Sequence, residues 1–403
     1  MFRVTQFLNE IDNPTAVGPR RDPPGPVVIW NLIRRCNLTC KHCYAISADK
    51  DFPGELSTQQ IYGVMNDLKE FRVPALILSG GEPLLHPDIF DISRRAKDMG
   101  FYVGLSTNGT LIDEVKIDQI ARVGYDYVGV SIDGLRGTHD KFRRREGAFD
   151  TSMHGVRLCR NRGLKVGLRF TMTQDNAHEL PDMLDMLEVE NIDRFYFSHL
   201  NYAGRGNHNR KDDAFFAATR SAMDLLFERT LKGIRSGIRR EIVTGNNDAD
   251  GVYLLQWIKK NYPDHAAHMR EKLVQWGGNA SGVNVANIDN VGEVHPDTMW
   301  WHYGLGNVKD RTFSEIWQDT SDPLMAGLKA RPRKLKGRCG QCREVAICGG
   351  NTRVRADQIT GDPWAEDPAC YLGDDEIGIE DQDLGERVTL TPFSASRGRR
   401  KAV

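Results

Sequence analysis

Short apolar runs alternate with amphipathic segments along the first half of the chain. The runs are rich in Val, Ile, Phe and Tyr, which is typical of strands that are buried on both faces. They cover residues 27–33, 75–81, 102–107, 127–133, 166–173 and 194–200. We therefore predict six strands in this part of the chain.

The segments between these runs have helical patterns, for example residues 57–71 and 89–100. Gly100 suits a helix C-cap, and Ser57 and Asp88 suit N-caps, although we expect no full capping box at Ser57. Strands that alternate with helices predict an α/β fold with a parallel sheet and right-handed crossovers. Since six repeats fall short of the eight in a complete barrel, we expect a partial (β/α)6 barrel of the TIM type.

Composition divides the chain into five parts. Residues 1–26 are polar and Pro-rich, which predicts an irregular lead-in, and residues 27–211 form the expected barrel. Residues 212–275 look helical, and residues 276–373 form a small second module that is richer in Gly and Trp. Residues 374–403 are a charged tail that we expect to be loosely held.

Charge and hydropathy narrow the class of protein. Charged residues make up 27% of the chain and the formal net charge is -1, which disfavours nucleic acid as a partner. No apolar run approaches the roughly 20 residues that span a bilayer, and we find no secretory signal, so no membrane partner is expected. A cytoplasmic location follows, and there clustered cysteines are more often metal ligands than disulfides.

The eight cysteines form one triplet, one quartet and one single residue. Cys36, Cys40 and Cys43 lie just after the first predicted strand. Three thiolates can hold three irons of a [4Fe–4S] cluster and leave the fourth iron open to a ligand such as the amino and carboxylate groups of a methionine moiety. The alternative is a zinc site with His42 or a distant residue as fourth ligand.

The quartet supplies a complete set of thiolates for a closed cluster or a structural zinc, and spacing alone does not separate the two. It consists of Cys339, Cys342, Cys348 and Cys370. Cys159, in contrast, has the pattern of a helix packing residue.

Four motifs at successive strand ends carry a family resemblance. CNLTCKHC (36–43), SGGEP (79–83), STNG (106–109) and SIDG (131–134) resemble the cluster and cofactor motifs of the radical S-adenosylmethionine (SAM) superfamily. The resemblance implies SAM as cofactor and an arginine among residues 143–145 near its carboxylate, with His42 as a packing residue. The implied SAM contacts are Gly80, Gly81, Glu82, Pro83, Asn108, Ser131 and Asp133.

The distal cysteines resemble the C-terminal half of the SPASM domain, the auxiliary-cluster module of many radical SAM enzymes. Asp297 stands where that domain has an upstream cysteine. The resemblance therefore implies one auxiliary cluster, as in the shorter twitch variant, and two [4Fe–4S] clusters in total. A structural or electron-relay role is expected for the second cluster, because four cysteines leave no iron open.

Residues 27–373 are most similar to the NirJ-type radical SAM enzymes of haem d1 biosynthesis, above all in SHLNYAGRGNHN (198–209). The resemblance implies removal of propionate side chains from 12,18-didecarboxysirohaem through a 5′-deoxyadenosyl radical, with a ferredoxin- or flavodoxin-type electron donor. Cations for the carboxylates and an imidazole for the iron would suit such a tetrapyrrole substrate. The candidates are Arg169, His199, Arg205, His208 and His295, and no catalytic residue is assigned.

Other functions stay open from the sequence. One is a radical SAM decarboxylase of another haem precursor, and another is a SPASM-type peptide-modifying enzyme. The short stretch before the first strand disfavours the latter, since those enzymes often begin with a peptide-recognition domain. A non-catalytic zinc or iron–sulfur protein is the alternative of a different class.

Overall fold

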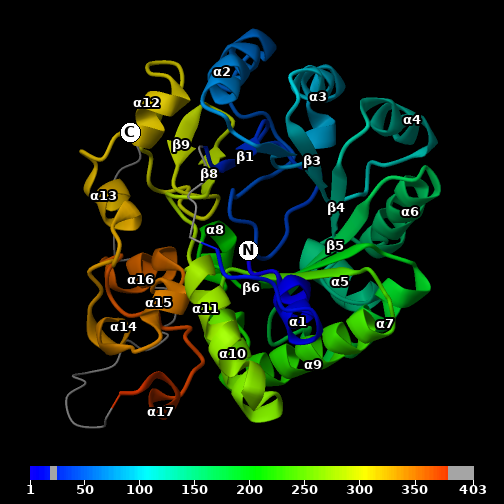
Figure 1. Cartoon of the computed structure of the whole chain (residues 1–403). Coiled ribbons are helices and arrows are strands. Elements are labelled where there is room, and N and C mark those ends of the chain that lie inside the picture. Colours follow the sequence, from blue (N-terminus) through cyan, green and yellow to red (C-terminus); the bar gives the residue numbers. More distant parts are fainter. Residues whose placement is uncertain (19–24, 380–403) are drawn as a thin grey trace.

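The computed structural model describes residues 1–18 and 25–379 of the 403-residue chain. One sheet organises these residues, in the order β10-β9-β8-β1-β2-β3-β4-β5-β6-β7. The helices surround the curved sheet, and the last part of the described chain, drawn in orange and red, lies to one side of it (Figure 1). The expected partial barrel is therefore confirmed, with a larger sheet than the sequence predicted.

Seven strands of the sheet run parallel in chain order. They are β1 (Val27–Asn31), β2 (Ala75–Ser79), β3 (Tyr102–Thr107), β4 (Tyr127–Ser131), β5 (Val166–Met172), β6 (Arg194–His199) and β7 (Glu241–Gly245). The first six match the predicted strands. The seventh lies within residues 212–275, so the prediction that this region is wholly helical is wrong.

The second module contributes three more strands to the same sheet. β8 (Val285–Ile288) pairs in parallel with β1, while β9 (Glu293–His295) and β10 (Gly306–Asn307) continue as antiparallel neighbours. The sequence did not predict this pairing. Part of residues 276–373 therefore extends the barrel sheet and does not stand apart from it.

The helices fall into three groups along the chain. Those between the parallel strands are α2 (Thr58–Glu70), α3 (Ile89–Asp98), α4 (Glu114–Val123), α5 (Arg136–Arg143), α6 (Ala148–Asn161), α7 (Leu180–Val189), α8 (Gly204–His208) and α9 (Phe216–Arg235). After β7 come α10 (Ala249–Asn261) and α11 (Ala266–Trp276). The C-terminal group is α12 (Phe313–Gln318), α13 (Pro323–Lys329), α14 (Gly337–Gln341), α15 (Val345–Cys348), α16 (Arg353–Thr360) and α17 (Asp374–Ile377).

Four 3₁₀ turns complete the regular structure of the described residues. They are η1 (Pro83–Leu85), η2 (Ala177–Glu179), η3 (Arg210–Asp212) and η4 (Pro263–His265). The first of these directly follows the SGGE stretch at the end of β2.

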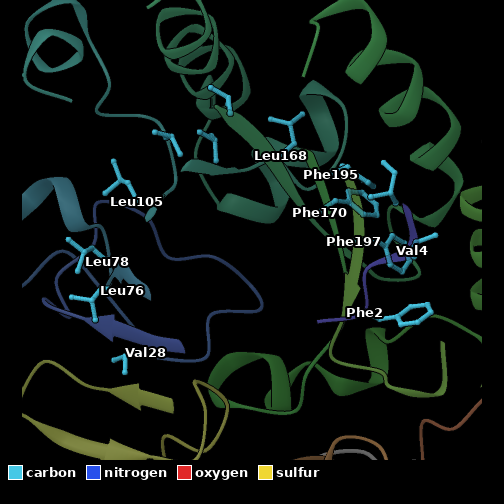
Figure 2. Packing of buried hydrophobic residues seen from close by; sticks show 14 of the residues in the cluster. Phe2, Val4, Val28, Leu76, Leu78, Leu105, Leu168, Phe170, Phe195 and Phe197 are labelled. Carbon is cyan, nitrogen blue, oxygen red and sulfur yellow. The ribbon is translucent and has the colours of Figure 1, made fainter. Parts of the chain in front are cut away.

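The outer face of the sheet forms the hydrophobic core. Alternate strand residues such as Val28, Leu76 and Leu168 are fully buried between the strands and the surrounding helices (Figure 2). The opposite face points into the barrel and carries half-buried polar side chains such as Arg169 and Tyr196. The prediction that the strands are apolar on both faces is thus right only for the outer face.

Glycines leave room for aromatic rings inside the barrel. A Cβ at Gly167 would overlap the Tyr127 hydroxyl, and one at Gly245 would overlap the Tyr196 hydroxyl. Inside the barrel, the Tyr127 ring therefore lies over Gly167 of β5, and the Tyr196 ring lies over Gly245 of β7.

Three local expectations need correction. Residues 1–26 are not simply irregular, because α1 (Val4–Asp12) forms there. Ser57 does have a full capping box, since Gln60 is the N3 residue and bonds back to the Ser57 backbone N–H. The predicted charged tail begins with α17, and its residues 380–403 lie outside the described part of the chain.

The N-terminal segment is fastened to the edge of the sheet. Phe2 and Thr244 of β7 exchange two backbone hydrogen bonds of 2.8 Å. On α1, the Glu10 carboxylate accepts hydrogen bonds from Thr15 and lies 3.0 Å from His268 and 3.2 Å from Lys272. Burial alone would raise the pKa of Glu10, but the hydrogen bonds from His268 and Thr15 outweigh it and lower the pKa to about 2.

Replacing Glu10 by Gln should lower the stability of the protein at neutral pH. Because the pKa of Glu10 is depressed in the folded state, its contribution is present above the ordinary value of 4.5 and is lost as the pH falls toward 2. Urea unfolding should show the largest deficit at pH 7 and a shrinking deficit toward pH 3. Glu114→Gln is the control, since its ion pair with His154 is exposed and contributes little. An equal effect of the two variants at pH 7 would refute the assignment.

Candidate active site

The cysteine triplet lies in the loop between β1 and α2, over one end of the parallel sheet. Cys36 and Cys40 are buried and Cys43 is half-buried. Each of the three sulfur atoms accepts a hydrogen bond from an N–H group. The donors are Leu38 N to Cys36 at 3.4 Å, Arg143 Nη1 to Cys40 at 3.4 Å and Ser47 N to Cys43 at 3.5 Å.

Burial keeps the two inner thiols of this loop in their neutral form. It raises the pKa of Cys36 to about 12, with a further contribution from Glu82, and it also raises the pKa of Cys40. Metal ligation needs the thiolate, so a metal must displace these protons. The N–H donors around each sulfur suit the negative charge that ligation leaves there.

The SGGEP segment is pressed against the same loop. Gly81 N donates to Ile33 O at 2.6 Å and Glu82 N donates to Arg35 O at 2.9 Å. A Cβ on Gly80 would overlap the Ile33 carbonyl, and one on Gly81 would overlap the backbone carbonyls of residues 34 and 35. Both glycines are therefore required by the close approach of two backbone segments.

The Glu82 carboxylate is completely buried and is engaged by protein groups. It accepts hydrogen bonds from Leu84 N at 3.1 Å, Thr107 Oγ1 at 2.7 Å and Asn108 N at 2.8 Å. Burial raises the pKa of Glu82 in spite of these bonds. Glu82 thus braces the ends of β2 and β3 against each other, and its contact with the SAM amino group stays a prediction.

Asn108 and Ser131 lie at the next two strand ends. Asn108 Nδ2 donates to Asn37 Oδ1 at 2.9 Å and approaches Cys36 Sγ at 3.9 Å, which ties the STNG segment to the cysteine loop. Ser131 is half-buried at the end of β4, on the inward face of the sheet. The structure brings these residues to the same side of the barrel as the cysteines.

Arg143 is the one arginine of residues 143–145 that points inward. It is buried, whereas Arg144 and Arg145 are exposed. Its guanidinium pairs with Asp133, whose Oδ1 also accepts a hydrogen bond from Thr171 N at 2.8 Å. Burial would raise the pKa of Asp133, but the charge of Arg143 outweighs it and the pKa is lowered. Arg143 therefore links the SIDG carboxylate to Cys40.

Arg205, a predicted substrate residue, instead supports the cysteine loop. Its Nε donates to Cys40 O at 2.7 Å and its Nη1 donates to Ser47 O at 3.0 Å. Asn209 adds a 2.7 Å bond to Lys41 O. No pattern in the sequence predicts these bonds, because the partners lie more than 150 residues apart. His42 packs on Phe142 with 4.7 Å between ring centroids, as predicted.

Several buried polar atoms around this loop have no hydrogen-bond partner among the described residues. They are His42 Nδ1, Ser47 Oγ, His139 Nε2, Arg143 Nε, Asn201 Nδ2 and Arg205 Nη2. Buried polar groups in proteins are almost always satisfied, so such a concentration indicates a place where a polar ligand binds. The residues present therefore fit a cluster with a polar cofactor beside it.

The four distal cysteines line one small cavity between α10 and the C-terminal helices. Backbone N–H groups again point at sulfur, from Asp367 to Cys339 at 3.4 Å and from Glu344 to Cys342 at 3.3 Å. Burial raises the pKa of Cys342 to about 11. No group of three or more His, Cys, Asp or Glu side chains among the described residues is placed so that it could hold one metal ion. All four predicted auxiliary ligands nevertheless line this one cavity. Cys159 is buried in the main core.

The remaining substrate candidates are spread around the barrel. Arg169 lies inside it, bonded to Ser106 with its guanidinium 5.9 Å from the Tyr196 ring. His199 is buried at the end of β6, and His208 is exposed at the end of α8. His295 is buried on β9. The structure does not gather the three histidines into one cluster.

Comparison with known proteins agrees with this site. Residues 30–187 match the radical SAM superfamily. The chain is 55% identical to pre-heme d1 synthase of Dinoroseobacter shibae over 98% of both chains. It is 46% identical to Fe-coproporphyrin III synthase of Methanosarcina barkeri over 88% of this chain and 89% of that one.

Solved structures share the fold at low sequence identity. Streptococcus suis SuiB bound to S-adenosylmethionine matches with a TM-score of 0.66 and 17% identity, over 90% of this chain and 80% of that one. Native anSMEcpe with bound AdoMet matches with a TM-score of 0.65 and 17% identity, over 85% and 94%. These similarities support the barrel assignment.

Fold and cysteine loop together define a radical SAM enzyme, a class that uses SAM and a [4Fe–4S] cluster. The chain belongs to the radical SAM family of haem-biosynthesis enzymes that includes pre-heme d1 synthase. The prediction of an enzyme is confirmed, and the non-catalytic alternative is wrong. None of the helices in residues 1–18 and 25–379 is long and apolar enough to cross a membrane.

Replacing Arg143 by Met should destabilise the protein by about 3–5 kcal/mol, because Asp133 would be left as an unpaired buried charge. The double variant Arg143→Met with Asp133→Asn removes both charges and should recover most of the loss. Chemical denaturation under anaerobic conditions measures both values. A double variant no more stable than the single one would show that Arg143 does not serve to neutralise Asp133.

Proposed function

We propose that the protein removes propionate side chains from 12,18-didecarboxysirohaem in haem d1 biosynthesis. The observation that carries the proposal is the 55% identity with pre-heme d1 synthase over 98% of both chains. The match covers the residues of this chain that form the barrel, the second module and the segments that connect them. The inward face with Arg169 and the tyrosines suits a large aromatic ligand that bears carboxylates.

Cys36, Cys40 and Cys43 are the proposed ligands of the cluster that binds SAM. Three observations support this proposal. The cysteines lie in one loop, an N–H group donates to each sulfur, and buried polar atoms without hydrogen-bond partners surround them. When bound and reduced, the cluster and SAM would supply a 5′-deoxyadenosyl radical as the agent for hydrogen abstraction from a propionate.

The protein side chains hold this site in place. Arg205 and the SGGEP backbone fix the cysteine loop from two sides. Glu82 and Arg143 set the positions of the strand ends on which the loop rests. For SAM itself we propose contacts from the residues at the strand ends beside the loop, namely Gly80, Gly81, Glu82, Pro83, Asn108, Ser131 and Asp133.

The distal cysteines are the proposed ligands of a second [4Fe–4S] cluster. Four thiols around one cavity complete its coordination, so a structural or electron-relay role suits it better than direct binding of substrate. We also propose a ferredoxin- or flavodoxin-type protein as the source of electrons, because the chemistry needs them singly.

The 46% identity with Fe-coproporphyrin III synthase supports a second candidate, the formation of Fe-coproporphyrin III. Both candidates concern iron tetrapyrroles and differ in the side chains that are changed. Product mass separates them directly.

Anaerobic incubation of the reconstituted protein with SAM, dithionite and 12,18-didecarboxysirohaem should give a product that lacks two propionate groups, together with 5′-deoxyadenosine. Mass spectrometry follows both compounds. The triple variant Cys36→Ala, Cys40→Ala and Cys43→Ala is the control and should form neither. Fe-coproporphyrin III as product would favour the second candidate, and unchanged tetrapyrrole in the presence of SAM cleavage would reject both.

Iron content tests the two proposed clusters. The parent protein should contain about eight iron atoms per chain after anaerobic reconstitution, four for each cluster. Cys339→Ala with Cys342→Ala should halve the iron and leave some uncoupled SAM cleavage, because the SAM site lies at the barrel. Cys159→Ala, a cysteine in the core, should leave the iron unchanged. Zinc in the distal site, or about twelve irons in the parent, would contradict the two-cluster proposal.

A further inference from the structure

One ring nitrogen of His295 is hydrogen-bonded and the other has no hydrogen-bond partner. Its Nδ1 lies 2.8 Å from the Tyr303 carbonyl oxygen, which only accepts hydrogen bonds, so Nδ1 carries the proton. Its Nε2 is buried and has no hydrogen-bond partner. An imidazole whose Nδ1–H is fixed by a carbonyl presents the Nε2 lone pair, the usual state of a histidine that binds a metal.

The nearest charged group to this nitrogen is Asp289, whose Oδ2 lies 3.6 Å from Nε2. That distance is longer than a hydrogen bond. The other oxygen of Asp289 accepts hydrogen bonds from Val291 N and Glu293 N, which holds the carboxylate in the turn before β9. Asp297 is a further acidic neighbour.

His295 lies on the inward face of the sheet. It is the register partner of Asn287 on β8, and directly opposed residues of an antiparallel pair share one face. Asn287 Nδ2 donates to Asn31 Oδ1 at 2.6 Å, and Asn31 donates to the Tyr44 hydroxyl and to Gly80 O. Asn287, which lies opposite His295, and Asn31 therefore form a hydrogen-bonded chain that reaches the SGGEP motif.

Aromatic rings and a cation extend from His295 to the cysteine loop. Trp301 stacks on the His295 ring at 5.8 Å, and Tyr44, next to Cys43, lies 5.9 Å from Trp301. The Arg34 guanidinium lies 5.9 Å from the Trp301 ring. These side chains other than His295 are half-buried. Together they offer the aromatic surface and the cation that a tetrapyrrole with carboxylate groups requires.

The other two candidate histidines lack this arrangement. His199 Nε2 lies 3.0 Å from Asp250, which also accepts hydrogen bonds from Thr244 and Tyr371 and so joins β6, β7 and the C-terminal segment. His208 is exposed on α8. Of the three histidines, only His295 has an Nδ1–H held by a backbone carbonyl together with a buried Nε2 that has no hydrogen-bond partner.

We infer that Nε2 of His295 is the protein ligand of the iron in the tetrapyrrole substrate, an inference that rests on the proposed function. Trp301 and Arg34 form the surface beside it. The role is to bind and orient the substrate next to the SAM site. It assigns no step of the radical reaction to His295.

Two probes separate iron ligation from general binding, namely iron-coproporphyrin III and metal-free coproporphyrin III, which carry the same carboxylates. His295→Gly should lose the histidine-ligated absorption spectrum of the iron probe and bind it about tenfold more weakly or worse. Its affinity for the metal-free probe should change by less than about twofold, since the carboxylate and ring contacts remain. Added imidazole should restore the ligated spectrum. His199→Gly and His208→Gly are the matched controls and should keep it.

Three results would overturn the inference. The first is a parent-like spectrum in His295→Gly, and the second is loss of the ligated spectrum in either control variant. The third is an equal loss of affinity for both probes in His295→Gly. That result would mean that His295 and Asp289 only stabilise the turn. Asp289→Asn tests that last case, because it should leave iron ligation intact. If the parent converts 12,18-didecarboxysirohaem while His295→Gly keeps the ligated spectrum, the inference fails and the proposed function stands. If the parent converts no tetrapyrrole, the proposed function itself fails.

Discussion

The close contact between the cysteine loop and the end of β2 is the constraint on which the site depends. Gly81 N donates a hydrogen bond to Ile33 O. The two backbones lie so close together here that only glycine fits at positions 80 and 81. Glu82 then takes up hydrogen bonds from the end of β3. This buried carboxylate joins the strand ends that lie beside the loop, and Arg143 and Arg205 hold the loop from the other side.

The second module belongs physically to the barrel. β8 extends the sheet by pairing with β1, and the Asp250 carboxylate joins β6, β7 and the segment after Cys370 through three hydrogen bonds. The distal cysteines are therefore held at a definite place relative to the strand ends. This rigid connection suits a cluster that passes electrons, since transfer depends on a fixed separation.

Two buried arginines hold the C-terminal region together. Arg353 and Arg355 are fully buried, and Arg355 forms an ion pair with the equally buried Asp367. Arg353 bonds to the backbone carbonyls of Pro363 and Ala365 and approaches Cys339. Such networks fix one conformation, because each buried charge must keep its partner.

The sequence by itself determined the first six strands, the two cysteine sets and the chemistry of the class. Apolar runs of six to eight residues and closely spaced thiols are local signals, so they can be recognised without knowledge of the fold. β7 was missed because its five residues lie between long helical patterns. β8 was missed because its pairing with β1 joins residues more than 250 positions apart.

Only the tertiary structure decided which side chains serve which purpose. Arg205 and His199 look like substrate residues in the sequence, yet they bond to the cysteine loop and to Asp250. In the sequence His295 looks like any other histidine. The structure shows that its Nδ1 is hydrogen-bonded to the Tyr303 carbonyl and that its buried Nε2 has no hydrogen-bond partner. The physical reason is that a polar side chain's role depends on its nearest partners, and folding brings those together from distant parts of the chain.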